Sequence, residues 1–239
     1  MPSPSRIFLS AEWRNLIIVS YHAPAALLAP HLPKGLDLDL IEGTPTVSLV
    51  AFEFLNTRVF GVPWPGFVNF PEWNLRFYVK TREPTPRRGV VFIREFVPSR
   101  IVSGIARKLY NEPYTAAPMR FAAQTKDFIS TARCEVRFNH ASHTLDATAS
   151  STLEVPHDTS TATLLKEHQW GFGATRTGQT LCYEVTHPIW RVHQNATSSA
   201  AMDWRKMYGE EWSAMQNVAP FSTVLAEGSA VTVSTGLRL

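Results

Sequence analysis

Four polar side chains alternate with apolar ones along the segment FPEWNLRFYV, residues 70–79. If this segment is a β-strand, successive side chains point to opposite faces, so Glu72, Asn74, Arg76 and Tyr78 share one face. A carboxylate, an amide, a guanidinium and a phenol together suit a small anionic or carbonyl-bearing ligand. A strand with one solvated face has the same pattern, so an internal polar cavity and an ordinary exposed face both remain open.

A second pair of charges, Arg94 and Glu95, interrupts the apolar run VVFIREFVP, residues 90–98. Neighbouring strand residues point to opposite sides, so one of the two should face the interior, where a charge needs a partner. We expect Arg94 or Glu95 to pair with Glu72 or Arg76 across adjacent strands. The alternative is an edge strand whose charges oppose aggregation.

A third polar set follows a helix expected over residues 98–110, whose apolar residues recur at helical spacing. The set consists of Tyr110, Asn111, Glu112 and Tyr114. These residues would lie on a loop held by a rigid scaffold, where function often resides. Asparagine and proline at 111–113 also simply end a helix, so that interpretation stays open.

The histidines and cysteines form no metal-binding pattern. His140 and His143 lie in NHASH without a carboxylate or cysteine at ligand spacing, and His187 is interpreted as a strand-end histidine, with a base as the alternative. Cys134 and Cys182 form no CxxC pair and are expected to be free thiols. The sequence contains no GxSxG, HExxH, phosphate-binding glycine loop or dinucleotide fingerprint. We therefore expect neither a metal nor a cofactor.

The elements that would position these groups are mostly strands. Strands rich in β-branched and aromatic residues are expected over 16–21, 46–55, 73–80, 90–97, 128–138, 144–155 and 180–187, and a hairpin over 222–226 and 230–234 around Glu227-Gly228. Helices are expected over 24–32, 98–110, 158–168 (capped by Asp158 or Ser160) and 200–216, the last broken near Gly209. This is a mainly β chain with peripheral helices, and a long β-rich chain usually closes into a barrel or packs two sheets.

Length and composition narrow the class of protein. The 239 residues predict one domain, 1–239, and 44% hydrophobic residues suffice for a large core. A net charge of only +3 argues against a nucleic-acid partner, and the longest apolar run near the N-terminus, residues 16–19, is far below the roughly 18 residues of a membrane span. The N-terminus lacks the order of a signal peptide, so a soluble cytoplasmic protein without a membrane partner is expected.

The motifs YHAP, VSLVAFEF, EWNLRFYV, RGVVFIREFVP, ARKLYNEPY, HPIW and AEGS follow one another in the chain. In this order the sequence resembles an uncharacterised bacterial family allied to the acetoacetate decarboxylase-like superfamily, from about Phe8 to the C-terminus. The resemblance implies a closed or cone-like antiparallel β-barrel with helices around it. It also makes a homo-oligomer plausible.

The resemblance carries over to a few positions. It places Tyr21-His22 at a Tyr-Arg pair of the superfamily and Glu72 at a catalytic-site glutamate, while a lysine pair after a proline is replaced here by Tyr114-Thr115. Decarboxylation in the superfamily proceeds through a Schiff base on a lysine, and tyrosine and threonine cannot form that imine. Lys108 is the lysine nearest the motif, and we expect it to extend to water.

These observations predict a small-molecule enzyme that acts on a carbonyl compound or organic acid without that lysine. Glu72 would be the general acid or base, Arg76 or Arg94 would hold the acid, and Tyr78 or Tyr110 would donate a hydrogen bond to a developing oxyanion. The expected substrate-binding residues are His22, Asn74, Arg94, Glu95, Asn111, Glu112 and Tyr114. The alternative is a non-catalytic protein that binds or senses a small ligand.

Overall fold

The computed structural model describes residues 6–63, 67–101, 103–104, 113–175 and 177–239. The strands are β1 Ile7–His22, β2 Leu36–Leu38, β3 Thr46–Val59, β4 Val62–Pro63, β5 Phe70–Thr81, β6 Arg88–Val97, β7 Tyr114–Ala116, β8 Met119–Lys126, β9 Ile129–Phe138, β10 Ala141–Ser150, β11 Leu153–Glu154, β12 Trp170–Ala174, β13 Thr180–Thr186, β14 Val192–His193, β15 Thr197–Ala201, β16 Ser222–Ser234 and β17 Leu237–Arg238. The α-helices are α1 Ala25–Leu28, α3 Thr161–Lys166 and α4 Trp204–Tyr208, and the 3-10 helices are η1 Ala29–His31 and η2 Glu210–Met215. The predicted mainly β chain with few helices is confirmed.

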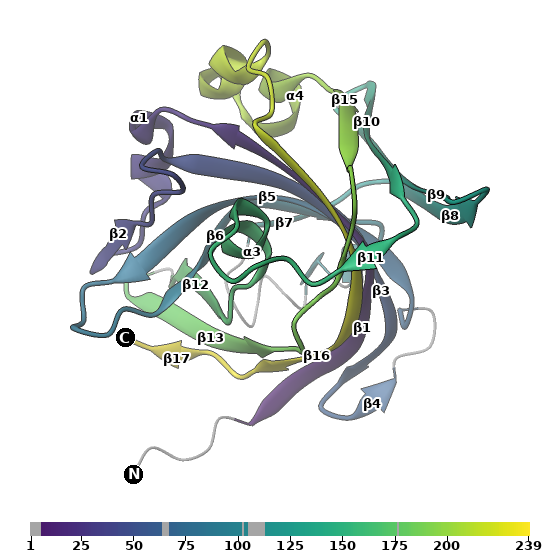
Figure 1. Cartoon of the computed structure of the whole chain (residues 1–239). Helices are drawn as coiled ribbons and strands as arrows, with labels where there is room; N and C mark the ends of the chain where they lie inside the picture. The colour runs from purple at the N-terminus through teal and green to yellow at the C-terminus, as the bar shows by residue number, and fades with distance from the viewer. Residues whose placement is uncertain (1–5, 64–66, 102, 105–112, 176) are drawn as a thin grey trace.

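The larger sheet curls into a ring of strands (Figure 1). Its order is β16-β1-β3-β5-β6-β12-β13, and β13 pairs with β16 again through Val185↔Val233. Most neighbours are antiparallel, whereas β12 runs parallel to β6. The ring gives every strand in it an inner and an outer face.

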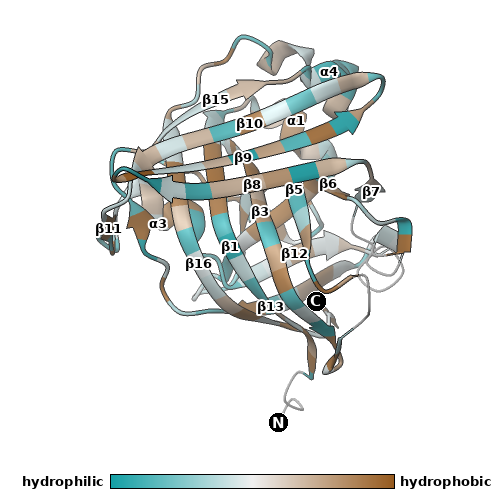
Figure 2. Ribbon diagram, turned by 90° about the vertical axis from the view of Figure 1, so that its right-hand side faces the viewer, coloured by the Kyte–Doolittle hydropathy of each residue, from teal (hydrophilic) through white to brown (hydrophobic). Residues whose placement is uncertain are grey.

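A second sheet, in the order β15-β10-β9-β8, lies across the outside of the ring with its strands crossing those of the larger sheet (Figure 2). The largest core fills the space between the two sheets and under α4 and η2. Trp73, Leu75 and Phe77 of β5 are fully buried in this core. The apolar face of β5 is therefore the outer face of the ring, and its polar face points inward.

The C-terminal segment differs from the predicted hairpin. β16 continues through Glu227-Gly228 and pairs with β1 on both sides of that point, with Leu16 opposite Ala226 and Trp13 opposite Ser229. Gly228 has φ +77°, and a Cβ there would lie 1.9 Å from the carbonyl oxygen of Trp13. The glycine thus permits a bend and a close backbone approach within one strand rather than a turn between two.

The predicted helix over 24–32 corresponds to α1 and η1, which together cover 25–31, whereas α3 covers only 161–166 of the predicted range 158–168. α3 begins after Ser160, whose Oγ accepts a hydrogen bond from the Thr163 amide at 3.2 Å. α4 and η2 flank Gly209, at φ +122°, as the predicted break requires, and β15 takes the start of the range 200–216. Of the predicted helix over 98–110, residues 100, 101, 103 and 104 are helical and 105–110 lie outside the described residues. Within the described ranges, none of the helices combines the length and apolar character needed to cross a bilayer.

Candidate active site within the ring

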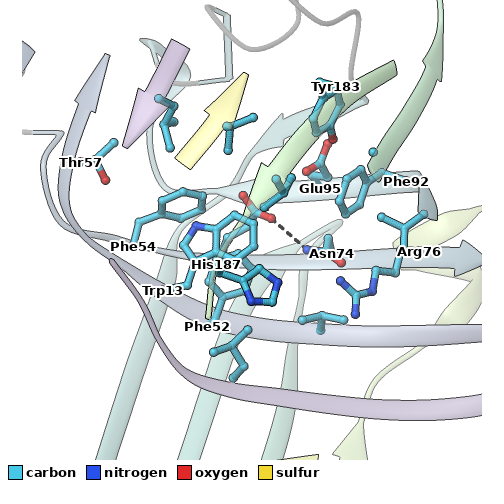
Figure 3. A pocket seen from close by; sticks show the side chains of 18 of the residues that line it. Trp13, Phe52, Phe54, Thr57, Asn74, Arg76, Phe92, Glu95, Tyr183 and His187 are labelled. Carbon is cyan, nitrogen blue, oxygen red and sulfur yellow. Dashed lines mark hydrogen bonds between the residues drawn. The ribbon is translucent and has the colours of Figure 1, made fainter. Parts of the chain in front are cut away.

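A cavity of about 160 Å³ lies on the inner face of the ring. It is comparable with the roughly 150 Å³ of an apolar protein cavity that binds benzene. Side chains from β1, β3, β5, β6, β12 and β13 line it, together with residues at the end of α3. In Figure 3 the rings of Trp13, Phe52 and Phe54 gather on one side of this space, and the polar side chains of β5 and β6 lie on the other side together with the rings of Phe92 and Tyr183.

The apolar end is an aromatic cluster around Trp13. The Trp13 ring lies 5.1 Å from Phe52, 5.7 Å from Phe54 and 6.1 Å from Trp190, centroid to centroid. Trp190 is held in turn by a 2.8 Å hydrogen bond from Nε1 to Ser229 Oγ. Such a wall favours a ligand with an apolar or aromatic body.

The polar end is centred on Glu72, which is 2% exposed. Its carboxylate accepts hydrogen bonds on both oxygens, from Asn74 Nδ2 at 2.9 Å and from the Tyr114 hydroxyl at 3.0 Å. Asn74 lies two residues along β5 on the same face, and Tyr114 begins β7, which pairs with β6 in parallel. Residues from two strands that are separate in the chain thus fix one carboxylate.

Burial controls the acidity of this group. Desolvation raises the pKa of Glu72 to about 7, although the hydrogen bonds from Asn74 and Tyr114 and the charge of Arg76 act in the opposite direction. A carboxylate with a pKa near neutrality can both accept and return a proton under physiological conditions. Such perturbed groups are concentrated at functional sites.

Arg76 supplies a positive charge two residues beyond Asn74. Its Nη2 donates to the carbonyl oxygen of Leu165 at 2.9 Å, so the end of α3 positions the guanidinium. Tyr78 lies outside the cavity lining, and its hydroxyl shares a 2.5 Å hydrogen bond with Ser48 and donates to Leu165 at 3.3 Å. Tyr78 therefore supports the wall, and Tyr114 is the phenol that reaches Glu72.

The end of α3 brings a second set of polar groups into the cavity, which the sequence interpretation missed. Lys166 has a side chain with no exposed surface and forms an ion pair with Glu167. The Nε2 of His168 lies 2.8 Å from the carbonyl oxygen of Leu164. His187 lines the cavity as well, with its ring stacked on Trp190 at 3.9 Å. For Lys166 and His168 the sequence offers one signal, the leucine pair of LLKEH at residues 164–168, which indicates a helix end that packs against the core.

Burial determines the charge state of the histidines. It lowers the pKa of His168 to about 3, and the nearby charge of Arg76 contributes to this shift. The same desolvation lowers the pKa of His187, although Glu167 opposes the shift. His168 is therefore a neutral imidazole at physiological pH.

Other sequence-predicted residues are placed elsewhere. Glu95 is buried and lines the cavity, where it and Tyr183 point toward one another (Figure 3). Arg94 points to the outer face, because its Nη1 donates to the carbonyl oxygen of Met207. His22 is exposed and stacks on Phe221 at 4.1 Å, away from the cavity lining. Tyr110, Asn111, Glu112 and Lys108 lie outside the described residues.

The expected cross-strand charge pairing takes a different form. Glu95 lies opposite Asn74, and Arg94 lies opposite Leu75 across the β5–β6 ladder. Arg94 is bound to a main-chain carbonyl instead of a carboxylate. A register shift lies between Leu75 and Arg76, and the guanidinium of Arg76 donates to the carbonyl oxygen of Leu165.

The family model for DUF2071, described as an uncharacterized conserved protein, matches residues 10–230. The chain belongs to this family. It is 30% identical over 119 residues to the uncharacterized protein YqjF of Bacillus subtilis (strain 168), a match that covers 49% of this chain and 48% of the relative. The matched region thus spans about half the length of that curated relative.

Solved structures with the same fold cover nearly the whole chain. An acetoacetate decarboxylase from Legionella pneumophila has a TM-score of 0.68 at 14% identity, over 100% of this chain and 92% of its own. An acetoacetate decarboxylase-like enzyme from Sphingomonas wittichii RW1 gives 0.67 at 13%, over 97% and 92%. The enduracididine biosynthesis enzyme MppR, solved in complex with pyruvate, gives 0.66 at 10%, over 99% and 91%. The predicted resemblance of the fold to acetoacetate decarboxylase is confirmed.

Proposed function

We propose that this member of the DUF2071 family is a small-molecule enzyme that moves a proton on a carbonyl compound or organic acid. The ring of strands would act as a closed barrel whose interior is the reaction chamber. The observation that carries the proposal is Glu72, a carboxylate buried in the wall of a cavity and held there by two hydrogen bonds. Its pKa near 7 suits a general base that becomes a general acid in the reverse step.

Each neighbour has a role in this scheme. Glu72 abstracts a proton from the carbon next to the substrate carbonyl. As negative charge develops on the carbonyl oxygen, the Tyr114 hydroxyl, released from Glu72 when that carboxylate takes up the proton, donates a hydrogen bond to it. Arg76 holds the substrate carboxylate at the polar end, and Asn74 keeps the carboxylate of Glu72 in place.

The scheme contains no imine. Among the lysines within the described ranges, Lys166 is the one that lines the cavity, and its ammonium group is tied to Glu167 in an ion pair. An amine must be unprotonated to attack a carbonyl carbon, so this partner opposes nucleophilic attack. Lys166 instead contributes a fixed positive charge beside the binding site.

Hydrogen exchange tests the scheme across a whole class of candidate substrates. A panel of oxo acids and ketones is incubated with the protein in deuterium oxide, and deuterium uptake next to the carbonyl is followed by proton NMR. We expect the wild type to accelerate exchange in at least one compound, and Glu72→Gln to slow it by roughly 10²–10⁴-fold. Glu210→Gln, which changes an exposed glutamate in the same way, should match the wild type. Equal exchange with wild type and Glu72→Gln would contradict the base role.

A non-catalytic binding protein is the second candidate, and the largely aromatic wall around Trp13 favours it because apolar contacts bind without reacting. A thermal-shift screen of metabolites followed by turnover assays separates the two. Binding without conversion, unchanged in Glu72→Gln, would identify the binding protein.

We further propose a cytoplasmic location for a single domain over 1–239, without a nucleic-acid partner. Cys134 and Cys182 are both buried free thiols, which suits a reducing compartment, and the net charge is only +3.

A further inference from the structure

Three buried polar atoms that belong to cavity-lining residues have no hydrogen-bond partner within the described ranges. They are Oδ1 of Asn74, Nε of Arg76 and Nδ1 of His168. Two further such atoms, on Trp13 and Thr57, belong to the aromatic end. Buried polar atoms are nearly always paired in folded proteins, so the first three indicate which groups a bound ligand supplies.

The unpaired nitrogen of His168 is an acceptor. A carbonyl oxygen can only accept a hydrogen bond, so Nε2, which lies 2.8 Å from the Leu164 carbonyl oxygen, must carry the ring proton. Because the ring is neutral, Nδ1 is left with a lone pair and no hydrogen. His168 can therefore bind a ligand only through a hydrogen atom that the ligand donates.

The other two atoms complete the pattern. Asn74 uses Nδ2 on Glu72, which leaves Oδ1 as a second acceptor. Arg76 uses Nη2 on Leu165, forms no ion pair with any residue that the structure describes, and keeps Nε–H as a donor. This guanidinium is partly buried and its charge acts on Glu72 without forming an ion pair with it, so it can still bind an anion.

The donor on the ligand should be uncharged. Lys166 is neutralised by Glu167, but the charges of Arg76 and Arg88 both disfavour a positive charge at His168, so a ligand ammonium group beside this ring would be repelled. A hydroxyl group donates one hydrogen bond without carrying charge. The aromatic wall around Trp13 accommodates the rest of the molecule.

We propose that the cavity selects a hydroxylated apolar monocarboxylate, with its carboxylate at Arg76, its hydroxyl donating to Nδ1 of His168, and its apolar body on the aromatic wall. This inference rests on the proposed function and names its substrate class. A hydroxyl is also what an oxo acid gains when it enolises, so the same acceptor would favour the enol formed by proton transfer.

Matched ligands test the proposal by isothermal titration calorimetry on the full chain. The probes are 2-hydroxy-3-phenylpropanoate and 3-hydroxy-3-phenylpropanoate, compared with 3-phenylpropanoate, which lacks the hydroxyl. We expect at least one hydroxy acid to bind about tenfold or more tightly than the parent acid, because the parent leaves a buried acceptor unpaired. The methyl ether of that hydroxy acid keeps the oxygen but loses the donor, and its affinity should fall to that of the parent acid.

A variant assigns the preference to His168. His168→Phe keeps an aromatic ring beside Tyr78 and removes the acceptor. It should bind 3-phenylpropanoate as the wild type does and lose the preference for the hydroxy acid. If the variant fails to fold, the comparison of hydroxy acid, ether and parent acid on the wild type still decides the proposal.

The inference is wrong if the wild type binds the parent acid as tightly as both hydroxy acids, or if a folded His168→Phe keeps the preference. Neither result depends on turnover, so both are separate from failure of the proposed reaction. A donor-dependent preference in a protein that exchanges no deuterium would support the ligand class and contradict the enzyme.

Discussion

Replacing Glu72 by glutamine should remove a pH dependence from the stability of the protein. The folded state raises the pKa of this carboxyl from 4.5 to about 7, so the folded chain binds the proton more tightly than the unfolded chain does. Protonation therefore stabilises the fold. This contribution is complete below pH 4.5 and is lost as the pH rises through 7, because the folded protein must then carry a buried charge.

The magnitude follows from the change in proton affinity. A tenfold change in proton affinity corresponds to about 1.4 kcal/mol, so ionised Glu72 should cost the fold about 3 kcal/mol above roughly pH 8. The side chain is 2% exposed, so solvent screening reduces this figure little. Glutamine has nearly the same shape and carries no charge, so Glu72→Gln should not lose this stability at high pH.

Urea unfolding of the two proteins between about pH 5 and 8 provides the measurement. The free energy of unfolding of Glu72→Gln minus that of the wild type should increase by about 2–3 kcal/mol across this range. Glu210→Gln is the matched control, since its carboxylate is exposed, and it should follow the wild type. A difference that stays constant across that range would show that Glu72 ionises normally, and the proton-transfer role would then lose its physical basis.

Three further changes have defined outcomes. In Tyr114→Phe the pH midpoint of the Glu72 effect should move upward, because the hydrogen bond from Tyr114 lowers the pKa of the Glu72 carboxyl and its loss raises that pKa. An unmoved midpoint in the same urea series would mean that the hydrogen bond is absent in solution. Borohydride treatment in the presence of oxo acids should add no mass to the peptide that contains Lys166, and an adduct there by mass spectrometry would establish an imine route. Gly228→Ala should cost more than about 2 kcal/mol of stability and Gly178→Ala about 1 kcal/mol. Both glycines have positive φ, but of the two only Gly228 lies against a backbone carbonyl. Equal losses of unfolding free energy in urea would argue against that close approach.

The strands of the ring were predictable because β-branched and aromatic runs and a period of two are local properties of the sequence. The predicted segments 46–55, 73–80 and 90–97 lie within β3, β5 and β6. The break near Gly209 was equally local. The bend at Gly228 could not be predicted locally, because a turn and a close approach of two strands both require glycine. Which of the two forms depends on β1 lying alongside β16.

Some residues of the candidate site could likewise be predicted from the local sequence, and others could not. Alternation along β5 was enough to put Glu72, Asn74 and Arg76 on one face. The alternation does not indicate whether that face points to solvent or to a cavity, because both give the same sequence pattern. The resemblance also predicted His22 as a site residue, whereas its ring stacks on Phe221.

What the sequence determined by itself is which side chains of one strand act together, because neighbours two residues apart share a face in any β-strand. The tertiary structure alone decided that this face is enclosed, that Tyr114 reaches Glu72, and that Lys166 and His168 join them. These residues lie 42 to 96 positions beyond Glu72 in the chain. Their approach depends on the closure of the ring by β13 and β16 and on the packing of α3 against Tyr78, and no local pattern encodes either contact.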